Sequence, residues 1–246
     1  MMEGKIKNKQ SKSKRGYLNF PIILIRNFLD DPKLIYTKIL YCGIYNYART
    51  LYHPEDMEDK VEQTIQYLGV KKVDDKKKII EFAESVMNSN NKKAMTGIET
   101  ALLNEYYLNY KSEFEKIVLL AYLATVSIIG PSAYKKMTNE LLFCRMAGYN
   151  SISDINKIPS ILKKYYTRKY IDKIKNELQG KFNVKIYGRN VRGFYVSYKL
   201  SYEVLVEKVE ENRKSNQTKR KNAEKNEIIN RVRGKYNKDP EPNPDF

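Results

Sequence analysis

The chain contains 246 residues and carries 46 Lys or Arg side chains against 29 Asp or Glu, a formal net charge of +17. A balance this basic indicates a polyanionic partner, either a nucleic acid or an anionic membrane surface. The longest apolar run, residues 117–129, is too short for a membrane span, and no signal peptide is recognised. Because the basic residues are predicted on a helix and a hairpin and not on one long helix with an apolar opposite face, we expect no membrane partner.

Two further features of the composition concern the source and the compartment. The bias towards Lys, Asn, Ile and Tyr is typical of an AT-rich genome, which fits bacteria, their phages and mobile elements. Cys42 and Cys144 both lie in apolar helical runs, which predicts buried side chains in a reducing compartment. We therefore expect a cytoplasmic protein of a bacterial or phage-infected cell.

The N-terminal half begins with a polar, basic segment and continues as mostly helical chain. Residues 1–16 are predicted to be a disordered basic arm, and residues 17–110 a helical N-terminal domain. Residues 17–25 favour a short strand that Pro21 would keep at a sheet edge. The helices predicted in this domain are residues 32–51, 58–68, 75–87 and 96–110.

The C-terminal half is predicted to hold a second domain, residues 111–206, followed by a charged helical to disordered tail, residues 207–246. Residues 113–129 are apolar enough for a buried first helix. Residues 138–149 suit a second helix and the glycine-containing turn that follows it.

A basic amphipathic helix follows at Thr167, whose hydroxyl can cap it. Four apolar side chains recur at helical spacing and predict one buried face: Tyr170, Ile171, Ile174 and Leu178. The opposite face is polar and holds Arg168, Lys169, Asp172, Lys173 and Asn176. Gly180 is the expected left-handed C-cap. An ordinary solvated surface helix would show the same pattern.

Two alternating segments then predict a β-hairpin. The first has Phe182, Val184 and Ile186 at every second position, and the second runs from Phe194 to Leu200 in the same way. The intervening residues 188–193 are bounded by glycines, which tolerate a tight turn, and place Arg189 and Arg192 at its tip. The predicted fold class is mainly α with a small β-hairpin.

This order of elements resembles the winged helix-turn-helix superfamily, in particular plasmid- and phage-type replication initiators and transcriptional regulators. The resemblance covers residues 113–200 and implies a recognition helix at 167–178 with residues 182–200 as the wing. Residues 150–166 separate the second and third helices by more than a compact motif has, so residues 151–157 remain an alternative recognition segment.

The resemblance implies binding of double-stranded DNA and gives each basic residue a role. Major-groove candidates are Arg168, Lys169, Lys173 and Asn176, since Arg and Lys address guanine and Asn addresses adenine. Arg189 and Arg192 would lie in the wing. Phosphate contacts are expected from Lys163, Lys164, Lys175, Lys185 and Lys199. Residues 159–199 together hold eleven basic residues and two acidic ones.

The residue types needed for common enzyme chemistry are missing. His53 is the only histidine, so a metal-binding histidine pair is excluded, and no phosphate-binding glycine loop occurs. Cys42 and Cys144 have no zinc-site spacing. We expect no enzyme, no metal and no cofactor.

The sequence therefore predicts a DNA-binding protein of a mobile element or phage that acts in replication initiation or transcriptional regulation. Its further partners would be a second copy of the chain or replication and transcription proteins. The alternatives are a protein-interaction or phage-structural protein that docks a partner through the same fold, and an RNA-binding accessory factor.

Overall fold

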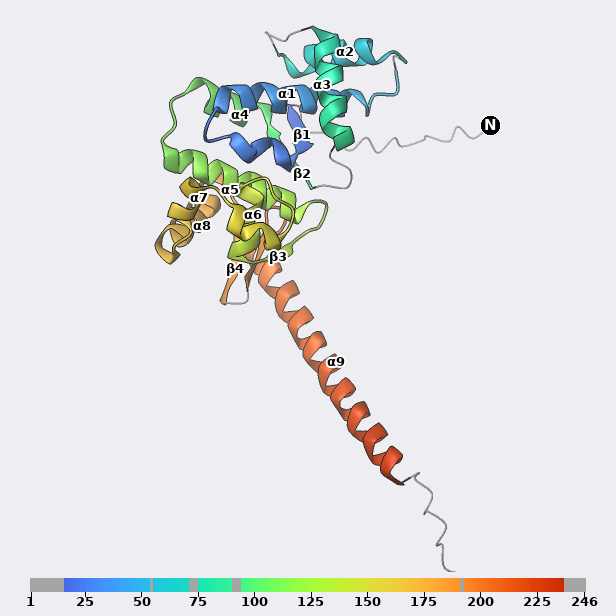
Figure 1. The fold of residues 1–246 in the computed structure, drawn as a ribbon. Helices are drawn as coiled ribbons and strands as arrows, with labels where there is room; N and C mark the ends of the chain where they lie inside the picture. The colour runs from blue at the N-terminus through green and yellow to red at the C-terminus, as the bar shows by residue number, and fades with distance from the viewer. Residues whose placement is uncertain (1–15, 54, 71–74, 90–93, 191–192, 237–246) are drawn as a thin grey trace, which may run out of the picture. The chain divides into compact units, whose positions relative to one another are not determined.

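Helices account for most of the chain, and they are joined by two small antiparallel sheets (Figure 1). The computed structural model describes residues 16–53, 55–70, 75–89, 94–190 and 193–236. It therefore confirms the mainly helical fold class. Residues 1–15 of the predicted arm at 1–16 lie outside the described residues, as do Arg192 at the hairpin tip and residues 237–246 at the end of the tail.

The chain divides into two compact units, one reaching Lys199 and the other beginning at Leu200. One core cluster extends from Leu18 to Val196 within the first unit. The division predicted after residue 110 therefore falls inside a continuous core. The second division lies seven residues earlier than the predicted tail at 207.

A two-stranded sheet opens the first unit. β1 (Tyr17–Pro21) pairs antiparallel with β2 (Met95–Glu99), and Pro21 is at the end of its strand. The strand at β2 corrects the helix predicted from residue 96, since α4 is only Thr100–Leu108. Thr96 and Ile98 are buried, and the Thr96 hydroxyl donates to the Leu123 carbonyl at 2.6 Å. Burial beside β1 thus favours the extended conformation.

The helices over this sheet follow the predicted positions with shorter or shifted ends. β1 leads into the 3₁₀ helix η1 (Ile22–Asn27) and then α1 (Pro32–Ala48), whose first turn is capped by Asp31. α1 packs on β1, and α2 (Met57–Leu68) and α3 (Lys76–Ser89) pack beside α1. Gly43 faces Leu18 so closely that any side chain there would collide with it.

α5 (Glu113–Ile129) is the central helix and has the bounds predicted from its apolar run. Ser112 and Glu115 form a reciprocal capping box at its start. Residues 117–121 are all buried, because α5 contacts β2 on one side and α6 and α8 on another. In Figure 1, α1, α4, β1 and β2 lie on one side of α5, and α6, α7, α8 and the second sheet on the other.

The second sheet has three strands in the order β3-β5-β4. β4 (Lys185–Asn190) and β5 (Gly193–Ser197) form the predicted hairpin, with Gly188 and Gly193 at positive φ. β3 (Lys135–Met137) was not predicted, and it pairs antiparallel with β5. The sequence predicts a strand from Phe182, but Phe182 is the last residue of the preceding helix and Asn183 is its C-cap. β4 therefore begins later, at Lys185.

The helices between these strands are α6 (Asn139–Met146), the 3₁₀ helix η2 (Ile152–Lys157), α7 (Ser160–Tyr165) and α8 (Arg168–Phe182). α8 corrects two predictions. Thr167 occupies the N-cap, but its hydroxyl makes no capping bond. Gly180 lies inside the helix, and the left-handed C-cap is Asn183, with φ 53° and ψ 27°.

The second unit is α9 (Tyr202–Tyr236), a helix of 35 residues. It begins earlier than the charged tail predicted from residue 207. Within the described ranges, every helix is too short or too polar to cross a lipid bilayer.

Candidate nucleic-acid interface

α8 divides into a buried face and an exposed basic face, as its sequence predicts. Ile171, Ile174 and Leu178 are buried and Tyr170 is half-buried, all on the side that faces the core. The exposed face carries the predicted polar residues Arg168, Lys169, Asp172, Lys173 and Asn176. The core therefore fixes which side chains α8 presents to solvent.

The three cations of this face have no partner within the described part of the protein. Arg168, Lys169 and Lys173 form no ion pair or hydrogen bond there through their side chains, and all three are exposed. By contrast, Lys181 on the same helix pairs with Glu177 at 3.1 Å. The cations of the exposed face are thus available to an anionic partner.

Two residues missed by the sequence reasoning extend this face. Gln179 is exposed and follows Asp172 and Asn176 at helical spacing, so its amide lies on the same side of α8. Gly180 is also exposed, and a Cβ built there meets no other atom within 4 Å. The helical periodicity would have indicated Gln179, whereas Gly180 was assigned to the end of the helix.

Lys175 lies on the side of α8 that faces the sheet. Its ammonium is 4.0 Å from the centre of the Phe194 ring in β5, a cation–π contact. Lys175, which the sequence predicts to contact a phosphate, therefore connects α8 to the hairpin in this structure.

Lys163 and Lys164, two further predicted phosphate contacts, lie in α7. Lys164 is 3.1 Å from the Glu113 carboxylate, to which the Tyr165 hydroxyl also donates at 2.6 Å. These hydrogen bonds, first that of Tyr165 and then that of Lys164, hold the pKa of Glu113 below its usual value. The Lys163 ammonium approaches the carbonyl oxygen of Asn156 at 3.4 Å. Both lysines remain exposed.

Lys185 and Lys199 are occupied by contacts within the first unit. The Lys185 ammonium donates to the side-chain oxygen of Asn183. The Lys199 ammonium donates to three carbonyl oxygens after α5, those of Gly130 at 3.3 Å, Pro131 at 2.8 Å and Ser132 at 3.1 Å. An ammonium has three donors, so these carbonyls saturate it. In this arrangement all three donors of Lys199 are used within the first unit.

The wing arginines are only partly described. Arg189 lies in β4, next to the hairpin tip, and its side chain is outside the described part of the structure together with Arg192. Lys136 is a further cation near this hairpin that the sequence reasoning missed. It is exposed on β3 and pairs in register with Tyr195 of β5.

The alternative recognition segment, residues 151–157, forms the short helix η2. Ser151 caps it, and its lysine, Lys157, pairs with Asp154 at 2.9 Å. Ile152 is exposed, as are Ser153 and Asn156. This segment offers polar side chains but no cation outside an ion pair among its described residues.

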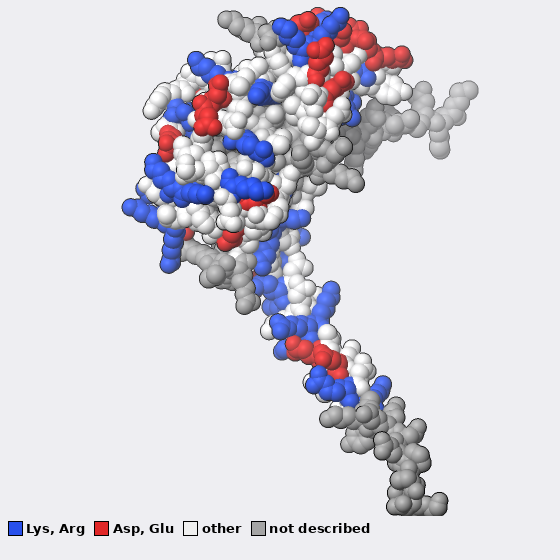
Figure 2. Space-filling model, viewed as in Figure 1, with Lys and Arg blue, Asp and Glu red and all other residues white. Residues whose placement is uncertain are grey.

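Charge is distributed unevenly over the first unit. Figure 2 shows Lys and Arg gathered over α7 and α8, and Asp and Glu gathered over α2. α2 begins after Glu55 and Asp56 and carries Glu58, Asp59 and Glu62. On the face that Figure 2 draws, the region of α7 and α8 is therefore more basic than the region of α2.

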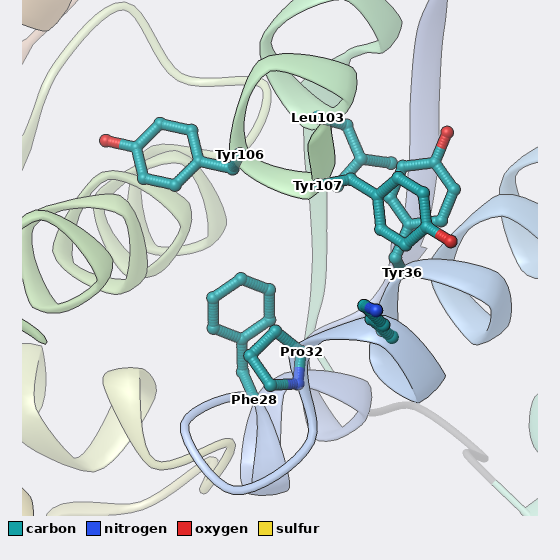
Figure 3. A pocket seen from close by; sticks show the side chains of 7 residues that line it. Phe28, Pro32, Tyr36, Leu103, Tyr106 and Tyr107 are labelled. Atoms are coloured by element: carbon teal, nitrogen blue, oxygen red, sulfur yellow. The ribbon is translucent and has the colours of Figure 1, made fainter. Parts of the chain in front are cut away.

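A small pocket lies between α1 and α4 (Figure 3). Its volume is about 30 Å³, and it is lined by Pro32, Lys33, Leu103 and four aromatic rings. The rings of Tyr36 and Tyr107 stack with their centres 4.0 Å apart. A space of this size holds about one or two waters, far less than a substrate pocket. Within the described ranges, no cluster of His, Cys, Asp or Glu could hold a metal.

Comparison of the chain with protein families, with characterised proteins and with solved structures finds no match.

Proposed function

We propose that residues 113–199 form a winged helix-turn-helix that binds double-stranded DNA. The order of elements supports this proposal: a buried helix, a short strand, a second helix, a basic helix and then a hairpin. In this interpretation α5, α6 and α8 are the three helices, and β4 and β5 form the wing. η2 and α7 are an insertion between the second and third helices.

The pairing of β3 supports the same interpretation. This strand follows α5 directly, yet it pairs with β5, the second strand of the hairpin. Because β3 lies between α5 and α6, this pairing attaches the hairpin to the segment that connects these two helices. The Tyr198 hydroxyl, which donates to Gly130 at 3.1 Å, and Lys199 add a second attachment after β5. These contacts hold β4 and β5 in place next to α8.

The observation that carries the proposal is the exposed face of α8. Arg168, Lys169 and Lys173 stand on a helix whose other face is anchored by Ile174 and Leu178. The major groove of DNA admits one α-helix, and Arg and Lys can bond guanine there while Asn bonds adenine. We assign base contacts to Arg168 and Asn176 and groove or phosphate contacts to Lys169 and Lys173.

α8 is a better recognition helix than residues 151–157. It has 15 residues, about 22 Å of helix, whereas η2 has six residues in a tighter 3₁₀ turn. Arg168, Lys169 and Lys173 on the exposed face of α8 have no ion pair among the described residues, whereas Lys157 is held by Asp154. These differences favour α8 in the groove and η2 beside it.

For the biological role we propose replication initiation or transcriptional regulation for a mobile element or phage. Both tasks require recognition of a particular DNA site, and the Arg, Asn and Gln side chains of α8 provide donors and acceptors suited to base edges.

The proposal is tested by selecting preferred duplex sites and measuring the affinity of variants. Arg168→Ala and Asn176→Ala should weaken binding to the preferred site by about 1–3 kcal/mol and leave binding to random DNA much less affected. Lys181→Ala is the matched control, because Lys181 lies on the same helix beside Glu177, away from the basic face. It should change neither affinity.

Two results would contradict the assignment. Full site preference in the α8 variants, with loss of preference after changes in residues 151–157, would identify η2 as the recognition segment. Unchanged binding in both sets, together with tight salt-insensitive binding to a protein, would make the fold a docking module.

A further inference from the structure

α9 is polar on all sides over most of its length. Residues 211–233 are all exposed, and the helix is supported locally by ion pairs within itself. Arg213 pairs with Glu210, Arg220 with Glu224 and Arg231 with Glu227, at 2.8, 3.1 and 3.1 Å. Each such pair stabilises a helix by only about 0.2–0.5 kcal/mol. The exposed part of α9 therefore gains little stability from its own side chains, and a partner that binds it would add to its order.

The charge of α9 indicates what kind of partner this is. Residues 213–233 hold eight Lys or Arg and only two Glu. Both of these glutamates already pair with arginines of the helix. The excess of positive charge fits a polyanion.

Three lysines form a stripe along one side of the helix. Lys214, Lys221 and Lys225 are spaced by seven and four residues, so they lie within about 40° of one another around the axis. They span about 16 Å along it. All three are exposed, and none has an ion pair or hydrogen bond through its side chain among the described residues. We call them the lysine stripe.

We propose that α9 is a second DNA-contacting element, in which the lysine stripe lies along consecutive phosphates of a DNA duplex. The proposal rests on the proposed function for the identity of its partner. It adds a sequence-independent contact to the base-reading helix, because lysines neutralise phosphates without reading bases.

A membrane surface fits α9 less well. Helices that bind in the plane of a membrane have a broad apolar face opposite their cations. Among the described side chains of α9 beyond residue 211, the large exposed apolar ones are Ile228, Ile229 and Val232, all near its end. The cationic segment before them has no such face.

The decisive experiment removes equal charge from two sides of α9 in the full chain. The stripe variant is Lys214→Gln, Lys221→Gln and Lys225→Gln. The control variant is Lys208→Gln, Lys219→Gln and Arg233→Gln, three exposed cations about a third of a turn away. Gln retains helix propensity similar to that of Lys and Arg. The readout is the slope of log affinity against log salt for a random duplex.

The stripe variant should have a slope shallower by about two to three, since each lost phosphate contact contributes about 0.9. The control variant should change it by less than about one. Equal changes in both variants, or no change in either, would overturn the proposal. Loss of binding to vesicles of anionic lipid, with DNA binding intact, would overturn it in favour of a membrane.

Amide hydrogen exchange provides a second measurement, and a change in net charge alone should not alter the exchange rates of α9. Amides of residues 211–233 should exchange rapidly in the free protein and more slowly when duplex is added. The stripe variant should lose this protection. Continued rapid exchange in the complex would overturn the proposal.

The same assays separate this inference from the proposed function. A triple variant Arg168→Gln, Lys169→Gln and Lys173→Gln removes the basic face of α8. If it loses DNA binding while the stripe variant is unchanged, the inference on α9 is wrong and the proposed function stands. If only the stripe variant weakens binding, α9 is a DNA contact and α8 is not the recognition helix. Absence of DNA binding by the natural chain would contradict both.

Discussion

Replacement of Gly180 by alanine tests where α8 ends, because the free energy of unfolding should rise if Gly180 is inside the helix and fall if it is a left-handed cap. Gly180 lies inside the helix, and a Cβ there meets no other atom within 4 Å. Glycine in a helix interior costs about 0.5–1 kcal/mol relative to alanine, because it loses more backbone entropy on folding. Gly180→Ala should therefore raise the free energy of unfolding by about 0.5–1 kcal/mol.

Asn183 should respond in the opposite direction. Its left-handed conformation costs most L-residues about 1–2 kcal/mol, and Asn tolerates it better than Ala. Asn183→Ala should lower the free energy of unfolding by about 1 kcal/mol. Asn183→Gly is the matched control: it also removes the hydrogen bond from Lys185 but fits the backbone, so it should be the more stable of the two variants.

Urea unfolding followed by near-ultraviolet circular dichroism measures both effects, since that signal reports on the packed tyrosines of the first unit. A loss of stability in Gly180→Ala, with no effect of Asn183→Ala, would refute the reasoning. It would mean that α8 ends at Gly180 in a left-handed cap, as the sequence alone suggests.

Three further variants test other parts of the first unit. Lys199→Gln should lower the free energy of unfolding by about 1 kcal/mol, because three carbonyls after α5 lose their donor, and should leave DNA affinity unchanged; the reverse pattern in unfolding and binding assays would restore a phosphate contact. Ile174→Ala should cost about 2–5 kcal/mol in urea unfolding, because the side chain is fully buried, and a cost below about 1 kcal/mol would contradict its place in the core. The carboxylate of Glu113 stabilises the fold above its ordinary pKa of 4.5, and this contribution is lost as pH falls through the lowered pKa of the folded state. The stability gap between the natural chain and Glu113→Gln should therefore be present at neutral pH and close in acid, whereas a gap independent of pH would contradict the hydrogen bond from Tyr165.

The features that the sequence predicted well are those encoded by local periodicity. The bounds of α5 follow from an apolar run with a capping box at its start. The buried face of α8 follows from Ile171, Ile174 and Leu178, and the hairpin from alternation and glycine. In each case neighbouring residues carry the signal, so no knowledge of distant contacts is needed.

The features that the sequence missed depend on partners far along the chain. β3 is only Lys135–Met137, which has no alternating pattern, and it is extended because β5 pairs with it. Similarly, β2 is a strand beside β1, although the sequence predicts a helix from residue 96 onward. Propensity gives way in such places to tertiary hydrogen bonding and burial.

The roles of the charged residues in the candidate site also depend on partners far along the chain. Lys173 and Lys199 look alike in the sequence, but Lys199 is saturated by the carbonyls that follow α5. Lys164 is held by Glu113, which lies 51 positions away. Sequence reasoning identified the exposed face of α8 and could not determine which other lysines the fold itself would use.

The most direct test of DNA binding through α8 is the salt dependence of affinity for a random duplex. If the protein neutralises about six phosphates, the slope of log affinity against log salt should be near −5. The variant Arg168→Gln, Lys169→Gln and Lys173→Gln should give a slope shallower by about two, because Lys169 and Lys173 are the proposed phosphate contacts of this face. A control of equal charge, Lys33→Gln, Lys77→Gln and Lys78→Gln on α1 and α3, should keep the slope of the natural chain. A flat salt dependence, or the same loss in both triple variants, would contradict the account.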